Sequence, residues 1–220
     1  MPVAVMIMAK APRAGDVKTR LCPPLSPVAA AALYRCFLLD KIEQVRALKD
    51  AHPVVAYTPD EARAEFEALA PGFALIPQHG ADLGARLLAS LGALLGDGHT
   101  GAIAIDSDTP TLPIAFLRQA VDRIADPTVD VVLGPTDDGG YYLIGMRAAR
   151  PDLFEAMEWS TPRVLDETLR RATTAGLRVV CLPPWFDVDT PDDLARLRDA
   201  VVRRHGHAPP HTTAFLTEQR

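Results

Sequence analysis

Short apolar runs alternate with helical patterns along almost the whole chain, and this alternation is the strongest constraint on its fold. The first run, Val3–Ala9, is nearly all apolar, as in a central strand that is buried on both faces. Strands that alternate with helices favour a mostly parallel sheet with helices on both faces. The sequence therefore predicts a single three-layer α/β/α domain with a mixed, mainly parallel sheet over residues 1–204, followed by a polar C-terminal tail over 205–220.

The predicted elements can be located by apolar periodicity and by start signals. Ser26-Pro27 and Thr190-Pro191 each combine an N-cap with a first-turn proline, so each marks the start of a helix. The predicted strands are 3–9, 53–58, 73–76, 101–105, 129–133, 141–146 and 177–182, and the predicted helices are 26–48, 59–69, 82–95, 113–124, 161–175 and 190–203.

Composition narrows the class of protein. Hydrophobic residues make up 48% of the 220 residues, which is enough for an ordinary buried core. The net charge of −5 argues against a nucleic-acid-binding domain, which favours a basic surface. Three cysteines without a CxxC pair indicate free thiols, and no apolar run reaches the length of a membrane span. We therefore expect a cytoplasmic protein without a membrane span, either a monomer or a homodimer.

Five predicted loops follow strands, and the carboxyl ends of parallel strands share one edge of a sheet, where ligands bind. These loops are 10–20, 78–84, 106–110, 135–140 and 183–189.

The first of these loops, KAPRAGDVKTRL, gathers the cations Lys10, Arg13, Lys18 and Arg20 in an acidic protein. The loop lacks the P-loop spacing GxxxxGK[ST], and the chain has no GxGxxG motif. Two interpretations remain open, a solvated basic loop and a cradle for phosphate groups.

Two other loops carry paired carboxylates in a repeated DxDTP pattern. The stretch IDSDTPTL contains Asp106 and Asp108, and FDVDTPDD contains Asp187 and Asp189. A single DTP is most often a helix cap, but two of them at one sheet edge would supply the oxygen ligands that Mg²⁺ prefers. Residues i and i+2 of an extended strand face the same side, so either member of each pair could reach the ion.

The remaining loops are less specific. GPTDDGGYYLIG is either a hairpin turn with solvated acids or an acceptor-binding loop formed by Asp137, Asp138, Gly139 and Gly140. In QHGADLG, a helix start and a base-recognition loop are equally good interpretations. The residues that would bind the nucleotide there are Gln78 and Gly80.

These motifs together resemble the nucleotide-diphospho-sugar transferase superfamily with the GT-A fold. More closely, the chain resembles a bacterial family of glycosyltransferases linked in part to arsenosugar biosynthesis. It is also similar to cofactor-biosynthesis guanylyltransferases, which share the KTRL start and the DxDTPxDL end. The matching segments are KAPRAGDVKTRL, QHGADLGARL, DSDTPTL, GPTDDGGYYLIG, EWSTP and DVDTPDDL.

The resemblance implies a role for individual residues. Asp108 and Asp189 match the metal-binding acids, with Asp106 and Asp187 as reserves. The matching phosphate-binding loop comprises Lys10, Arg13, Gly15, Lys18 and Arg20, and only Gly15 remains of the superfamily's usual glycine-rich start. Lys18 and Asp138 are the predicted catalytic residues.

We expect from this resemblance a glycosyltransferase that depends on Mg²⁺ or Mn²⁺, uses a nucleoside-diphosphate sugar and acts on a small-molecule acceptor. The first alternative is a guanylyltransferase-like nucleotidyltransferase that combines an NTP with a phosphorylated small molecule. The second is a catalytically inactive nucleotide-binding regulatory protein.

Overall fold

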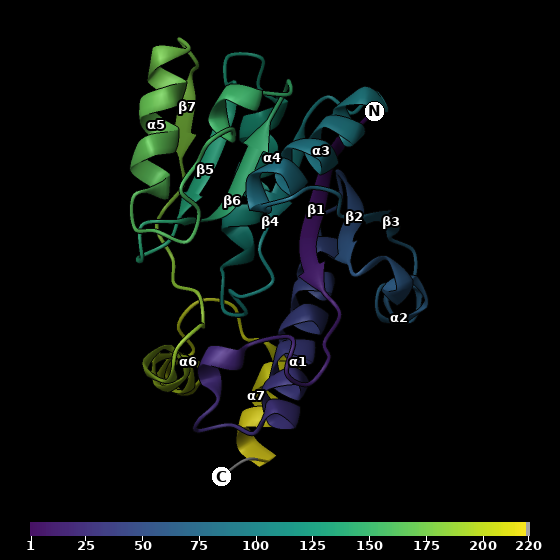
Figure 1. The fold of residues 1–220 in the computed structure, drawn as a ribbon, viewed down its shortest axis with the longest axis vertical. Coiled ribbons are helices and arrows are strands. Elements are labelled where there is room, and N and C mark those ends of the chain that lie inside the picture. Colours follow the sequence, from purple (N-terminus) through teal and green to yellow (C-terminus); the bar gives the residue numbers. More distant parts are fainter. Residues whose placement is uncertain (219–220) are drawn as a thin grey trace.

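A seven-stranded sheet runs through the protein in the order β3-β2-β1-β4-β6-β5-β7 (Figure 1), in a computed structural model that describes residues 1–218. Strand β6 is antiparallel to its neighbours β4 and β5, whereas the other paired strands are parallel. The strands are β1 (Val3–Lys10), β2 (Ala51–Thr58), β3 (Ala74–Pro77), β4 (Ala102–Ile105), β5 (Val131–Pro135), β6 (Tyr141–Met146) and β7 (Val179–Cys181). The predicted mixed, mainly parallel sheet is confirmed.

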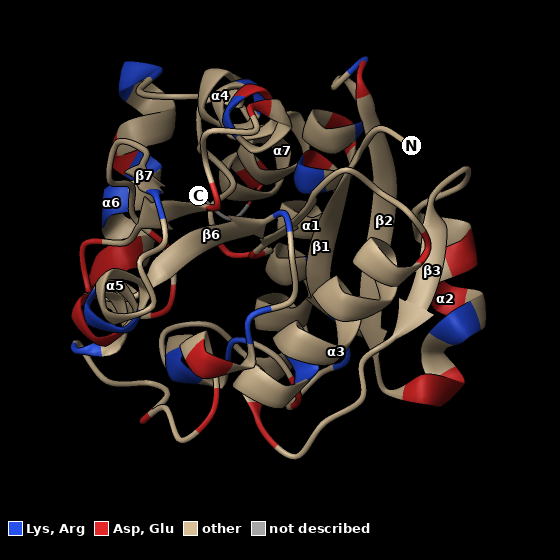
Figure 2. Cartoon of the chain, turned by 90° about the horizontal axis from the view of Figure 1, so that it is seen from above, with Lys and Arg blue, Asp and Glu red and all other residues tan. Residues whose placement is uncertain are grey.

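Helices cover both faces of the sheet, as the sequence predicts. The helices are α1 (Pro27–Arg46), α2 (Arg63–Leu69), α3 (Leu83–Gly96), α4 (Ile114–Ala125), α5 (Val164–Thr174), α6 (Pro191–Arg203) and α7 (Pro210–Glu218), with short 3₁₀ turns η1 (Thr19–Leu21), η2 (Asp60–Ala62) and η3 (Pro151–Leu153). Figure 2 shows that the charged residues lie on helices and loops, while the strands are almost free of them.

The central strand β1 divides the core into two parts. Val5 and Ile7 belong to the cluster that includes α1, α4 and α6, whereas Ala4 and Met6 belong to the cluster that includes α3 and α5. These four side chains are at most 1% exposed, which is the two-sided burial that the continuous apolar run predicts.

The predicted helix starts are also present. The hydroxyl of Ser26 accepts a hydrogen bond from the amide of Ala29 at 3.1 Å. Thr190 forms a reciprocal capping box with Asp193, in which each side chain accepts from the other residue's backbone. The second cap matters for the site because it fixes the chain directly after Asp189.

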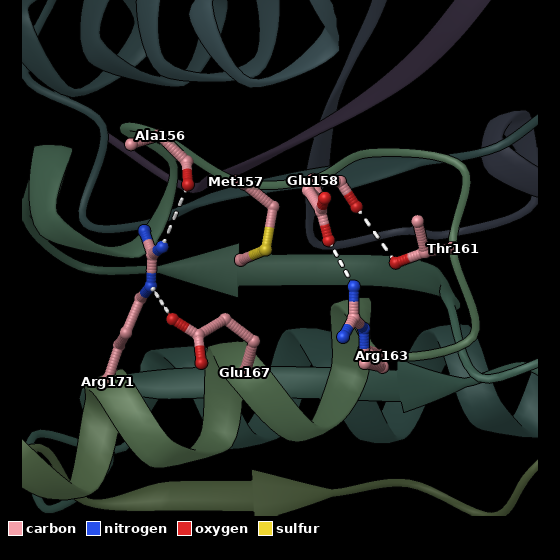
Figure 3. A pocket seen from close by; sticks show the side chains of 7 residues that line it. All are labelled: Ala156, Met157, Glu158, Thr161, Arg163, Glu167 and Arg171. Carbon is pink, nitrogen blue, oxygen red and sulfur yellow. Dashed lines mark hydrogen bonds and ion pairs between the residues drawn. The ribbon is translucent and has the colours of Figure 1, made fainter.

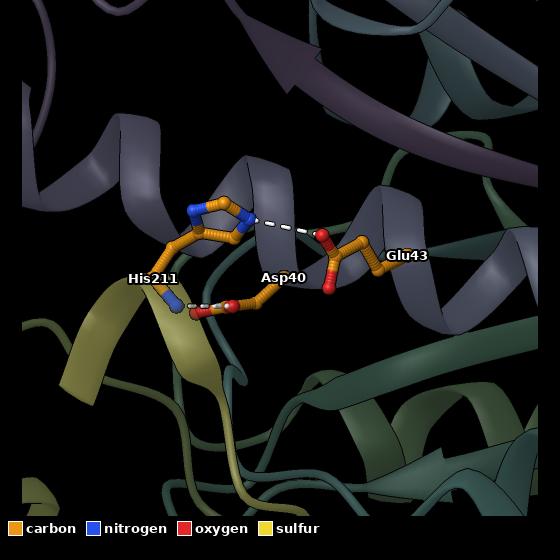
Figure 4. A group of neighbouring side chains, drawn as sticks. All are labelled: Asp40, Glu43 and His211. Atoms are coloured by element: carbon orange, nitrogen blue, oxygen red, sulfur yellow. Dashed lines mark hydrogen bonds and ion pairs between the residues drawn. The ribbon is translucent and has the colours of Figure 1, made fainter. Parts of the chain in front are cut away.

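The C-terminal segment differs from the predicted polar tail. Residues 210–218 form α7, which lies alongside α1, and residues 219–220 of the predicted tail lie outside the described residues. The buried carboxylate of Asp40 accepts a hydrogen bond from the amide of His211 at 2.9 Å (Figure 4). It also accepts from the amide of Thr212 at 2.9 Å and from the Thr212 hydroxyl at 2.6 Å. The acid that caps this helix lies 171 residues earlier, so the sequence around residue 210 does not reveal it.

We expect Thr212→Val to lower the free energy of unfolding by about 1–2 kcal/mol, because the buried Asp40 carboxylate loses a donor. The matched variant is Thr213→Val, where the neighbouring residue makes no such bond to Asp40, and we expect a change below about 0.5 kcal/mol. Urea denaturation of both variants measures the difference. Equal losses would mean that the Asp40 contact does not hold α7 in place.

Candidate functional site

The loops that follow the strands meet at one edge of the sheet and enclose a cavity of about 390 Å³. Its walls come from the loops after β1, β3, β4, β5 and β7, together with the segment that precedes α5. Carboxylates form one wall, contributed by Asp106, Asp108, Asp138, Asp187 and Asp189. The five loops predicted to share an edge therefore do so.

Lys18 bridges the two predicted metal ligands. Its Nζ lies 2.7 Å from Asp108 Oδ1 and 2.7 Å from Asp189 Oδ1, and its side chain is only 6% exposed. Burial alone would lower the pKa of Lys18, but the charges of Asp108 and Asp189 outweigh it, so that the pKa lies above its ordinary value. Arg20 adds a weaker contact, 3.5 Å from the other oxygen of Asp189. Two carboxylates from separate loops thus converge on one cation.

Lys18 reaches this position because of the local backbone. The residue has a left-handed conformation with φ of 49°, just before the 3₁₀ turn η1. A non-glycine residue in this region carries strain, which the two ion pairs offset here.

Asp138 and Asp187 form the second part of the acidic wall. Asp138 Oδ1 accepts hydrogen bonds from the Thr136 hydroxyl at 2.5 Å and from the Gly140 amide at 3.0 Å. Burial, followed by the charges of Asp138 and Asp189, raises the pKa of Asp187 to about 6. These carboxylates lie beside the cation site and face the same cavity.

The raised pKa of Asp187 predicts a dependence of stability on pH. An unfolded aspartate ionises near pH 4. In the folded protein Asp187 keeps its proton to about pH 6. Its contribution to the free energy of unfolding therefore decreases as the pH rises from 4 to 6. We therefore expect Asp187→Asn to become more stable relative to the wild type as the pH rises from 4 to 7. Thermal denaturation in metal-free buffer tests this, with the exposed Asp122→Asn as the control. A stability difference between Asp187→Asn and the wild type that does not change with pH would contradict the prediction.

The glycine pair after Asp138 allows this loop to lie close to the backbone of Pro162. Gly139 has φ of 90°, and a Cβ there would lie 2.1 Å from the carbonyl oxygen of Pro162. Gly140 lines the cavity. Asp137 pairs with Arg196 at 2.7 Å and lines a neighbouring hollow that also includes Asp189, rather than the main cavity.

The basic loop divides into two groups. Lys10, Lys18 and Arg20 line a hollow of about 250 Å³ next to Asp108. Arg13 instead points to η2 and α2, where it pairs with Glu61 at 3.2 Å and Glu65 at 2.5 Å. Gly15 provides the turn between these groups, with φ of 87°.

The residues after β3 have structural contacts. The amide nitrogen of Gln78 donates to the carbonyls of Ala9 at 3.1 Å and Ala56 at 2.7 Å, and so joins the ends of β1 and β2. Gly80 has φ of 147° and lies against the backbone of Ala85 at the start of α3. A base-recognition role for these residues stays a prediction.

The cavity also has an apolar wall. Leu83, Tyr141 and Trp159 line the cavity, and the Tyr141 and Trp159 rings meet edge to face at 6.4 Å. A Cβ at Gly84 would lie 2.7 Å from the Trp159 ring, so this glycine allows the tryptophan to close on α3. In the sequence, the motif that corresponds to this wall is the EWSTP segment, which contains Trp159.

Lys41 is a residue that the sequence reasoning missed. It is fully buried and donates to the loop that carries Asp106 and Asp108. A lone lysine in the apolar pattern of α1 was its only signal.

Two other clusters of polar side chains have structural roles. A cavity of about 360 Å³ beside α5 contains Arg171 and Glu167 (Figure 3), but the Arg171 guanidinium already pairs with Glu167 and donates to backbone carbonyls. Asp40, Glu43 and His211 place ligand atoms within 4.8 Å of one another (Figure 4). The oxygens of Asp40 are engaged by the start of α7, as described above, so we assign this group to helix capping.

Within residues 1–218, no helix combines the length and the apolar character that crossing a membrane requires.

Comparison with known proteins places this geometry in context. Residues 41–161 match the family of uncharacterised proteins conserved in bacteria, DUF2064. The chain is 32% identical to a candidate nucleotide-diphospho-sugar transferase from Desulfovibrio desulfuricans G20, and the match covers 98% of this chain and 94% of that one with a TM-score of 0.86. No curated protein sequence matches the chain.

More distant structures share the fold. A CMP:2-keto-3-deoxy-manno-octonic acid synthetase complexed with CTP is 14% identical, with a TM-score of 0.60 over 93% of this chain and all of that one. Glucosyl-3-phosphoglycerate synthase from Mycobacterium tuberculosis, in complex with Mn²⁺, UDP and glucosyl-3-phosphoglycerate, is also 14% identical, with a TM-score of 0.53 over 91% of this chain and 77% of that one. The fold therefore occurs in both nucleotidyl and glycosyl transferases.

Proposed function

The chain belongs to the DUF2064 family, and we propose that it is a metal-dependent transferase that moves a glycosyl group from a nucleoside-diphosphate sugar to a small-molecule acceptor. The family and the nucleotide-diphospho-sugar transferase fold support the class of reaction. The choice of glycosyl transfer, and the roles of individual residues, are the proposal.

The observation that carries the proposal is the convergence of Asp108 and Asp189 on one cation. The ammonium of Lys18 lies there, at 2.7 Å from an oxygen of each acid. Oxygen atoms of carboxylates are the ligands that Mg²⁺ and Mn²⁺ prefer. We infer that Asp108 and Asp189 would hold such an ion after Lys18 moves aside, and that Asp106 and Asp187 are the reserve ligands.

A bound divalent ion would supply charge stabilisation for the leaving diphosphate. The chain's own residues would do the rest. Lys18, Lys10 and Arg20 line the hollow next to Asp108, so they would share the charge of the phosphates. Arg13 has no such place, because Glu61 and Glu65 hold its guanidinium.

Asp138 is the candidate base for the acceptor hydroxyl. Its Oδ1 accepts two hydrogen bonds, whereas its Oδ2 has no hydrogen-bond partner within residues 1–218. The two donors orient the carboxylate. Oδ2 would therefore accept the proton of an acceptor hydroxyl that enters the cavity between the acidic wall and Trp159.

Nucleotidyl transfer is the second candidate. A buried, fully charged Lys18 beside a cation site would equally stabilise the α-phosphate of an NTP under attack by a phosphorylated acceptor. Both reactions would use the same residues.

Product analysis separates these candidates. The protein is incubated with Mn²⁺, a panel of NDP-sugars or NTPs, and neutral or phosphorylated acceptors. Release of NDP that depends on an acceptor supports glycosyl transfer, and release of pyrophosphate supports nucleotidyl transfer. Tight nucleotide binding without either product across the panel would contradict both and favour a regulatory protein.

A further inference from the structure

Besides Asp40, helix α1 turns two polar side chains into the core, one turn apart. Lys41 and Gln44 are 0% and 1% exposed. Both reach the loop after β4, where Lys41 meets Thr109 and the Gln44 amide donates to the carbonyl of Leu112 at 2.9 Å. The helix therefore holds the acidic loop at two points, and only the first is near the carboxylates.

The contact of Lys41 continues to the cation site as a chain of hydrogen bonds. Its Nζ donates to the Thr109 carbonyl and to the Thr109 hydroxyl, both at 2.9 Å. That hydroxyl donates to Asp106 Oδ1 at 2.6 Å, and the same oxygen accepts the backbone amide of Asp108 at 3.3 Å. Asp108 in turn pairs with Lys18. Because the Thr109 hydroxyl accepts from Lys41, its only proton points to Asp106, so the direction of the chain is fixed.

Stability alone does not account for a lysine at this position. Lys41 Nζ contacts the Thr109 carbonyl and hydroxyl, and within residues 1–218 this buried charge has no direct ion-pair partner. Burial lowers the pKa of Lys41, and the charges of Asp106 and Asp108 oppose this effect. An apolar side chain of similar length would avoid the cost of burying an ammonium group.

We propose that Lys41 is a positioning residue for the cation site. Through Thr109 it fixes the Asp106 carboxylate, which holds the Asp108 amide and so orients the Asp108 side chain toward the cation. The proposal rests on the proposed function, since it assumes that Asp108 binds a metal ion.

The test compares three variants of the full chain. Lys41→Met removes the first donor, Thr109→Val removes the relay while Lys41 remains, and Gln44→Met breaks the other contact of the same helix with the same loop. Mn²⁺ binding is measured by the free-ion EPR signal in the presence of a nucleoside diphosphate. We expect the dissociation constant for Mn²⁺ to rise about tenfold in Lys41→Met and in Thr109→Val, as for other residues that orient metal ligands, and to be unchanged in Gln44→Met.

Two further readouts separate positioning from general loosening of the fold. The double variant Lys41→Met with Thr109→Val should also lose about tenfold rather than the product of the single losses, because both changes break one chain. Hydrogen exchange at the Asp108 amide should accelerate in Lys41→Met and Thr109→Val but not in Gln44→Met, with or without metal. Binding of the bare nucleoside should stay unchanged in all three variants.

The outcomes distinguish this inference from the proposed function. A wild-type protein that binds no Mn²⁺ would overturn the metal site, while faster exchange at Asp108 in Lys41→Met would still support positioning. Wild-type Mn²⁺ affinity in both Lys41→Met and Thr109→Val, or equal losses in Gln44→Met, would overturn the role of Lys41. If Lys41→Met does not fold, Thr109→Val alone decides between these outcomes.

Discussion

Replacing Asp108 or Asp189 with asparagine is expected to abolish the Mn²⁺ dependence of nucleotide binding and to reduce turnover by about 10²–10³-fold. Each substitution keeps the shape of the side chain and removes one of the two negative charges that converge on the cation. Calorimetric titration of a nucleoside diphosphate, with and without Mn²⁺, measures the effect. The fold should persist, because Lys18 retains one carboxylate partner in each variant.

Asp122→Asn is the matched control. Asp122 is an exposed acid on α4, away from the cavity, and its loss changes the net charge by the same amount. Its nucleotide and Mn²⁺ affinities should match those of the wild type. If both Asp108→Asn and Asp189→Asn kept their full Mn²⁺ dependence, the metal would have to bind elsewhere, and Asp106 and Asp187 would be the next pair to replace.

Lys18→Met should change the affinities for phosphate and for metal in opposite directions. A lost charge-assisted hydrogen bond costs about 1.5–3 kcal/mol, so the affinity for a nucleoside diphosphate should fall by about one to two decades. The affinity for Mn²⁺ alone should rise, because the ammonium group no longer competes for Asp108 and Asp189. The bare nucleoside carries no phosphate and should bind as it does to the wild type.

Lys49→Met controls for the loss of one positive charge at an exposed position. Titrations with Mn²⁺, nucleoside and nucleoside diphosphate give the three affinities. Unchanged Mn²⁺ affinity in Lys18→Met would mean that the ammonium and the metal do not share a site. Equal losses for nucleoside and nucleoside diphosphate would mean that Lys18 supports the structure of the loop rather than the phosphates.

The sheet and its helices were predictable from the sequence because their signals are local. The apolar run of β1 and the caps at Ser26 and Thr190 each act within a few residues. The gathering of acids at one edge was also predictable, since it follows from the direction of parallel strands. In contrast, α7 depends on Asp40, which is distant in the sequence, and its own residues are mostly polar.

The sequence predicts which residues gather at the site, but not which of them form ion pairs with one another. No local pattern indicates that Lys18 turns inward to the acids, or that Arg13 turns outward to Glu61 and Glu65. Both are cations of one loop, and only the packed structure places carboxylates on either side of it. The same holds for Lys41, whose partner Thr109 lies 68 residues further along the chain.

The bridge between Lys18 and Asp189 has a consequence for the order in which the protein is completed during synthesis. The two residues are 171 positions apart. At about 5–20 residues per second, a ribosome would make Asp189 roughly ten to thirty seconds after Lys18. Strands β1 to β4 and Asp108 would already be available in that interval, but the second carboxylate would not. A nascent chain could therefore build half of the sheet before it acquired a two-acid cation site, and the ability to bind metal would report that β7 has joined the sheet.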